Sequence, residues 1–156
     1  MKDKAHIAYR KAFISDAKVI QKLIQEFAAK DEMLPRSLNQ IYERLRDFWV
    51  CEVDHKVRAC CALHITWEDL AEICSVAVSS ECQGKGIGKE LVRLALEEAR
   101  QLKIPKAFLL TYKPEFFGKL GFTEVDKNTL PKKVWAECVN CPKFPDCGEI
   151  AMVQDL

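Results

Sequence analysis

The sequence lacks the features that would place the protein in a membrane, outside the cell or on a nucleic acid. Its longest uninterrupted apolar run, Ala59 to Leu63, is too short for a transmembrane helix. Residues 1–4 do not lead into the apolar core of a signal peptide. The 24 basic and 23 acidic residues leave a formal charge of +1, which gives no general attraction to nucleic acid or to an anionic membrane. We therefore expect a cytoplasmic protein.

Internal repeats and low-complexity tracts are also absent from the sequence. A chain of 156 residues, 49% hydrophobic and 30% charged, is typical of one globular domain, here residues 1–156. Its eight cysteines are numerous, but disulfides are rare in a reducing compartment. Cys51, Cys60, Cys61 and Cys74 lie in apolar runs, and we expect them to be small buried hydrophobic residues.

Hydrophobic periodicity predicts a mixed sheet flanked by helices. A first helix is expected after Ser15 or Asp16, and a second after Ser37, which has capping-box spacing to Gln40. A third helix follows a glycine-rich loop, and Pro114 begins a short fourth one. Strands are expected at residues 6–13, 48–53, 57–66, 71–78, 107–111, 122–125 and 149–153. The order β-α-α-β-β-β-α-β-α-β-β predicts an α+β (mixed α/β) fold.

The glycine-rich loop, Gln83-Gly84-Lys85-Gly86-Ile87-Gly88, lies between a predicted strand and the most regular predicted helix. The free N–H groups at a helix start, together with the helix dipole, form an anion site, and glycines allow a ligand to approach the backbone. The glycine positions match neither a P-loop nor a dinucleotide-binding fold. From the glycines alone, a flexible turn that caps the helix remains an alternative.

Two motifs together resemble the GNAT superfamily of N-acetyltransferases. The run Ser75-Val76-Ala77-Val78 followed by Gln83-x-x-Gly86-x-Gly88 resembles the acyl-coenzyme A signature of that family. The segment 116–122, Phe-Phe-Gly-Lys-Leu-Gly-Phe, resembles its short helix ending in Leu-Gly-Phe. The resemblance covers roughly residues 6–125, and residues 149–153 would supply the last strand. It implies a single domain with a central, mostly antiparallel mixed sheet between helices.

The resemblance implies that acetyl-CoA is the cosubstrate and that no metal is required. The backbone of residues 84–89 would hold the pyrophosphate, and that of Val76 and Val78 would bind the pantetheine arm like an added strand. An N–H group near Val76 would stabilise the oxyanion. The implied cofactor-binding residues are Val76, Ala77, Val78, Gln83, Gly84, Lys85, Gly86, Ile87, Gly88 and Lys89.

Glu72 lies near the start of the strand that precedes the glycine loop, where the GNAT family often carries a general base. An aliphatic ammonium must lose a proton before its nitrogen can attack, so a base at this position would assist direct attack on the thioester. The alternative is an exposed carboxylate at a strand end. Phe117 stands where many relatives carry a tyrosine acid, and Tyr112 is close in sequence but not at that position.

Three further segments resemble the short-form amino-acid N-acetyltransferases that make N-acetylglutamate. They are residues 34–37, residues 110–114 and residues 130–147, the last of which contains a Cys-x-x-Cys pair. The substrate-binding residues that this resemblance implies are Leu34, Arg36, Ser37, Thr111 and Lys113. A guanidinium holds a carboxylate with two hydrogen bonds, and Arg36 with Lys113 and Lys132 suggests a basic pocket for L-glutamate. The product would feed arginine biosynthesis.

Several alternatives remain open at this level. Segment 130–148 is expected to be an insertion before the last strand, and its Cys138, Cys141 and Cys147 could be zinc ligands, a redox or structural pair, or plain thiols. The acceptor could instead be another small amine, a polyamine, a peptide N-terminus or a lysine. A CoA- or zinc-binding interaction module is the non-enzyme alternative. We expect a small-molecule partner, no nucleic acid or membrane partner, and a homodimer is possible.

Overall fold

The computed structural model describes residues 4–131 and 148–156. Its seven strands are β1 (Ile7–Lys11), β2 (Phe48–Val53), β3 (Lys56–Trp67), β4 (Leu70–Val78), β5 (Lys106–Thr111), β6 (Thr123–Val125) and β7 (Ile150–Asp155). Its helices are α1 (Ala17–Ala28), α2 (Leu38–Glu43), α3 (Ile87–Gln101) and α4 (Pro114–Gly118). Short 3-10 turns are η1 (Ile14–Asp16), η2 (Leu45–Asp47), η3 (Ser80–Cys82) and η4 (Lys127–Thr129). The predicted order of helices and strands and the predicted fold class are confirmed.

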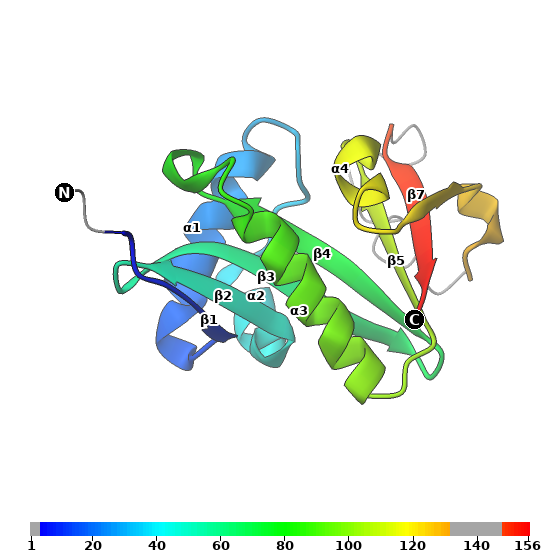
Figure 1. The fold of residues 1–156 in the computed structure, drawn as a ribbon, viewed down its shortest axis with the longest axis horizontal. Coiled ribbons are helices and arrows are strands. Elements are labelled where there is room, and N and C mark those ends of the chain that lie inside the picture. Colours follow the sequence, from blue (N-terminus) through cyan, green and yellow to red (C-terminus); the bar gives the residue numbers. More distant parts are fainter. Residues whose placement is uncertain (1–3, 132–147) are drawn as a thin grey trace.

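The sheet has the order β1-β2-β3-β4-β5-β7-β6, and only β4 and β5 are parallel neighbours among these strands. These two strands pair at Ala71 with Ala107 and at Glu72 with Phe108, and at no later residue. Figure 1 shows them diverging toward α4, with β7 alongside β5. The sheet is therefore open between β4 and β5 at the end where the glycine loop follows β4.

A β-bulge in β4 lies where this opening begins. The β3–β4 register shifts by one residue between the pair Cys60–Ala77 and the pair Ala62–Cys74. Ser75, in the shifted stretch, has a φ of 53°, in the left-handed region. A bulge bends its strand and increases the local twist. The bulge thus accompanies the divergence of β4 from β5.

Each face of the sheet is covered by helices (Figure 1). Helix α3 packs on one face through Leu91, Ala95 and Ala99. Helices α1 and α2 pack on the other face, where Ile20, Ile24 and Ile41 are fully buried. No helix of the described residues is long and apolar enough to cross a bilayer.

The expected burial of the strand cysteines is confirmed for three of the four. Cys51, Cys60 and Cys61 are fully buried, and burial raises the pKa of the Cys60 thiol to about 12. Cys74 departs from the expectation because it lies where β4 separates from β5, and it is only partly buried. Two apolar residues at the helix edges are exposed: Val19 is 40% exposed at the edge of the buried stripe of α1, and Leu102 is 51% exposed just after α3.

Candidate active site

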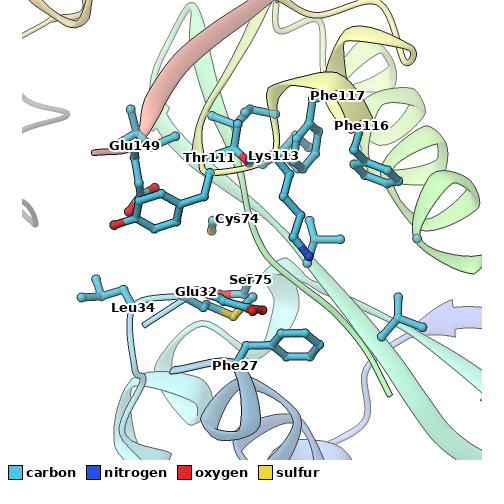
Figure 2. Close-up of a pocket in the computed structure, with 18 of the residues that line it drawn as sticks. Phe27, Glu32, Leu34, Cys74, Ser75, Thr111, Lys113, Phe116, Phe117 and Glu149 are labelled. Carbon is cyan, nitrogen blue, oxygen red and sulfur yellow. The ribbon is translucent and has the colours of Figure 1, made fainter. Parts of the chain in front are cut away.

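A cavity of about 1100 Å³ occupies the opening between β4 and β5. Its walls come from six parts of the chain: the end of α1 with the loop to α2, strand β4, the glycine loop with the start of α3, the end of β5 with α4, residues 126–128, and Glu149 before β7. Figure 2 shows Phe27, Glu32 and Leu34 on one wall, and Thr111, Phe117 and Glu149 on the opposite wall. Segments that are far apart in the sequence therefore meet around one space.

The glycine loop forms one end of this cavity. Gly84 and Gly86 have φ values of 78° and 79°, and a Cβ at either position would meet no atom within 4 Å. Gly86 is the N-cap of α3, and no side chain of the described residues makes a capping hydrogen bond there. The first N–H groups of a 15-residue helix are thus available at an open backbone surface. This arrangement fits a pyrophosphate, as the sequence predicts.

Gly88 has a different role from the two glycines before it. A Cβ at Gly88 would lie 3.5 Å from side-chain atoms of both Val78 and Phe116, an ordinary van der Waals contact, so α3 starts close to β4 and α4 at this residue. Gln83 donates a 3.1 Å hydrogen bond from Nε2 to the carbonyl of Val78. These contacts hold the loop against the end of β4.

Strand β4 presents an open edge to the cavity. The β4–β5 ladder ends at Glu72, so from Ile73 to Val78 the strand no longer pairs with β5. An extended ligand can add to such an edge through main-chain hydrogen bonds. Val76 and Val78 line the cavity. The Ala77 side chain instead points into the core beside α1, so only its backbone is available to a ligand.

The predicted loop residues mostly line the cavity. Those that do are Gln83, Gly84, Gly86, Ile87, Gly88 and Lys89. Lys85 is exposed and is not a lining residue.

Glu72 is the third residue of β4 and lines the cavity at the point where the two strands separate. Its neighbours across the sheet are His64 on β3 and Phe108 on β5. The carboxylate is therefore close to the opening in which the sheet offers backbone donors. Such a position suits a group that removes a proton from a molecule bound in the cavity.

Four of the five predicted substrate residues line the same cavity: Leu34, Arg36, Thr111 and Lys113. Figure 2 shows the Lys113 side chain extending from the end of β5 into the space. Thr111 accepts a 2.8 Å hydrogen bond on Oγ1 from the backbone N–H of Lys113, which shapes this turn. Ser37 is not a lining residue, because its hydroxyl accepts a hydrogen bond of 3.1 Å from the N–H of Gln40 and caps α2.

The cavity also contains residues that the sequence analysis missed, and several are acidic. Among them are Phe27, Glu32, Met33, Cys74, Asp126, Lys127, Asn128 and Glu149. The register of β5 with β7, in which Thr111 faces Ile150, brings Glu149 to the substrate end. No local pattern in the sequence indicates that register. The expected basic pocket is therefore of mixed charge among the described residues, and Lys132 lies outside them.

Cys138, Cys141 and Cys147 lie outside the described part of the chain, so zinc ligands, a redox or structural pair and plain thiols all stay open for them. Within residues 4–131 and 148–156, no group of three or more His, Cys, Asp or Glu side chains could hold a metal ion.

A split sheet with an open edge, followed by a glycine-rich helix start, defines a site for a phosphate-bearing coenzyme with an extended arm. Residues 17–122 match the model of the acetyltransferase (GNAT) family, and the chain belongs to this family. The protein is an acetyl-CoA-dependent N-acetyltransferase.

Similar proteins agree with this assignment. The chain is 39% identical over 152 residues to an uncharacterised N-acetyltransferase of Chlorobaculum tepidum, which covers 97% of this chain and 98% of that protein. It is 39% identical over 131 residues to an amino-acid acetyltransferase of Mycobacterium tuberculosis, covering 82% and 75% of the two chains. The structure of N-acetylglutamate synthase from Neisseria gonorrhoeae, complexed with coenzyme A and N-acetyl-glutamate, matches with a TM-score of 0.87 and 25% identity, over 99% of this chain and 36% of that one.

Proposed function

We propose that the protein acetylates the α-amine of an amino acid, with L-glutamate as the first candidate. The observation that carries this proposal is that Arg36 and Lys113, from distant segments, line the same cavity as Glu72. Two cations near a base suit an acceptor with carboxylates and one reactive amine. The similar proteins named amino-acid acetyltransferase and N-acetylglutamate synthase support the same substrate class.

Each residue then has a distinct task. Acetyl-CoA supplies an acetyl group activated as a thioester. The N–H groups at the start of α3 hold its pyrophosphate, and the open edge of β4 aligns its extended arm. Arg36 binds a carboxylate of the amino acid, and Lys113 adds a second positive charge at the end of β5. Glu72 accepts a proton from the ammonium so that the nitrogen can attack.

A second candidate substrate follows from the acidic residues of the cavity. Glu32, Asp126 and Glu149 line the space together with the cations. Carboxylates favour a substrate that carries an additional positive charge, such as a diamino acid or a polyamine. The positive charge of Arg36 attracts the carboxylates of glutamate but repels the ammonium groups of a polyamine. Substitution of Arg36 should therefore weaken binding of glutamate and not that of a polyamine.

A direct assay tests the proposal. The protein is incubated with acetyl-CoA and, in turn, each standard amino acid, spermidine and a peptide with a free N-terminus, while release of the CoA thiol is measured. We expect the highest kcat/KM with glutamate. A higher kcat/KM with spermidine or with the peptide would overturn the amino-acid assignment and leave the family assignment intact.

The remaining predictions concern the cellular setting. Formation of N-acetylglutamate would place the protein at the entry to arginine biosynthesis. The cytoplasm remains the proposed compartment, and this is supported by five free thiols in the described region: Cys51, Cys60, Cys61, Cys74 and Cys82.

A further inference from the structure

A hydrogen-bonded pair of ionisable side chains, His64 and Asp47, lies beside Glu72 but outside the cavity. Nδ1 of His64 on β3 lies 2.8 Å from Oδ2 of Asp47 on η2. In the antiparallel register of β3 and β4, His64 is the direct partner of Glu72. Side chains of directly opposed residues point to the same face, with Cβ atoms roughly 4.5–5.5 Å apart. Asp47, His64 and Glu72 therefore lie in succession on three neighbouring elements.

The hydrogen bond to Asp47 fixes the orientation of the imidazole ring. An ionised carboxylate only accepts hydrogen bonds, so Nδ1 of His64 carries the proton in this contact. In the neutral ring, Nε2 is then the acceptor. His64 is thus prepared to accept a proton on the nitrogen that does not face Asp47.

The locations of Glu72 and His64 relative to the cavity suggest a function for the orientation of the imidazole ring. Glu72 lines the cavity in which, by the function proposed above, acetyl-CoA and the amino acid bind. His64 is not among the lining residues, and its side chain is 32% exposed to solvent. In the proposed reaction, acetyl-CoA and the amine occupy the cavity beside Glu72, so a second route would let the proton reach solvent. His64 offers such a path on the same face of the sheet, away from the cavity lining.

We propose that His64, oriented by Asp47, is a positioning residue that passes the proton from Glu72 to solvent. The proposal rests on the role given to Glu72 above. Acetylation of an ammonium releases two protons, one of which ends on the CoA thiol while the other must reach solvent. Glu72 accepts the latter, Nε2 of His64 takes it directly or through one water, and the imidazolium releases it to bulk water. Among the described residues, Asp47 is hydrogen-bonded to His64, and Glu72 is its direct cross-strand partner.

Nuclear magnetic resonance tests the arrangement without requiring activity. The chain has three histidines, and His6 and His55 stack on each other with ring centroids 5.3 Å apart, so they serve as internal references. We expect long-range ¹H–¹⁵N spectra to show His64 protonated on Nδ1. Glu72→Gln should shift the Nε2 signal of His64 and leave His6 and His55 unchanged. If Glu72→Gln leaves all three histidines unchanged, His64 does not communicate with Glu72 and the proposal is wrong.

Kinetics test the proton path itself. We expect His64→Gln to lower kcat by about 10- to 100-fold with little change in the KM for acetyl-CoA. Added imidazole should restore part of the kcat of His64→Ala. His55→Gln is the matched control and should behave like the wild type. A wild-type kcat in His64→Gln, or no rescue by imidazole, would overturn the proposal.

The two proposals fail in different ways. If the wild-type protein acetylates no amino acid, the proposed substrate class fails, and the His64 variants are then assayed with the amine that it does acetylate. If amino acids are acetylated and Glu72→Gln is impaired while His64→Gln is not, only the proton path fails.

Discussion

The thiol of Cys60 donates a 3.4 Å hydrogen bond to the backbone carbonyl of Ser75, which links the interior of β3 to the bulge in β4. Burial raises the pKa of Cys60 to about 12, so this sulfur remains a neutral S–H donor. The contact holds Ser75 at the point where β4 and β5 separate. The open edge that receives the coenzyme therefore depends on a backbone conformation fixed from the neighbouring strand.

Substitution of Ser75 tests whether this conformation matters. Because Ser75 has a φ of 53°, a β-branched residue is strained there. We expect Ser75→Val to lower the free energy of unfolding by about 1–3 kcal/mol and to weaken CoA binding. Ser75→Gly, which accepts positive φ, is the control and should retain CoA affinity. Equal CoA affinity of folded Ser75→Val and Ser75→Gly would show that the bulge does not shape the site.

The glycine loop gives a charge-specific prediction. Gly86 has open space around its Cα and a φ of 79°, a conformation that Asp and Asn tolerate better than most residues. The two side chains have nearly the same shape, but only Asp adds a negative charge near the pyrophosphate. We expect Gly86→Asp to bind CoA on the order of tenfold more weakly than Gly86→Asn, measured by calorimetry. Equal affinities would argue against an anion at this helix start.

The acid–base role of Glu72 predicts a change in rate and not in binding. Glu72→Gln keeps the size of the side chain but removes its ability to accept a proton. We expect kcat to fall by about 10²–10⁴-fold, while the Kd for acetyl-CoA stays within about twofold. Glu68→Gln, in the exposed turn of the same hairpin, is the control. A wild-type kcat in the Glu72 variant would reduce this residue to a structural carboxylate.

The position of Arg36 in the cavity leads to a prediction about selectivity for glutamate. Loss of one charge-assisted contact to a carboxylate costs about 1.5–3 kcal/mol, so Arg36→Ala should raise the KM for glutamate by roughly 10- to 100-fold. Arg36→Lys should recover only part of this loss, because lysine has no two-pronged donor geometry. Acetyl-CoA affinity and the control Arg100→Ala, on the surface of α3, should be unaffected. An unchanged KM for glutamate in Arg36→Ala would contradict the substrate assignment.

The link between β1 and η1 predicts how stability depends on pH. Arg10 donates a hydrogen bond of 2.6 Å to Asp16, and the N–H of Phe13 donates another of 2.7 Å. Burial alone would raise the pKa of Asp16, but these hydrogen bonds and the charge of Arg10 outweigh it and lower that pKa. The stabilisation is therefore present above the unfolded-state pKa, near ~3.9, and is lost as the pH falls through the lower folded-state value.

Urea unfolding at about pH 7 and about pH 3 measures this effect. We expect Asp16→Asn to lower the free energy of unfolding at the higher pH by about 1–3 kcal/mol and to make its decrease on acidification smaller. Asp155→Asn is the control, because that carboxylate is 87% exposed. A parallel acid-induced loss in the Asp16 variant and the wild type would contradict the role of Asp16.

Local sequence patterns predicted the structural features that depend only on residues close together in the chain. The capping box of Ser37 and Gln40, the apolar stripe of α3 and the glycine loop each follow from short-range chemistry, and the structure contains all three. The cavity residues that the sequence did not indicate are placed by the pairing register between strands that are far apart in the chain. The pairing of Thr111 with Ile150 places Glu149 at the cavity, and the bulge at Ser75 exposes Cys74 to it. Neither relationship has a signature within either strand alone.

Product identification tests the central claim most directly. The protein is incubated with ¹³C-acetyl-CoA and L-glutamate, and the product is analysed by mass spectrometry and NMR. Our account predicts one acetyl group per glutamate, attached to the α-nitrogen, formed in equal amount to the CoA released. Release of CoA at the same rate without glutamate, or no acetylated glutamate despite saturating acetyl-CoA, would contradict it.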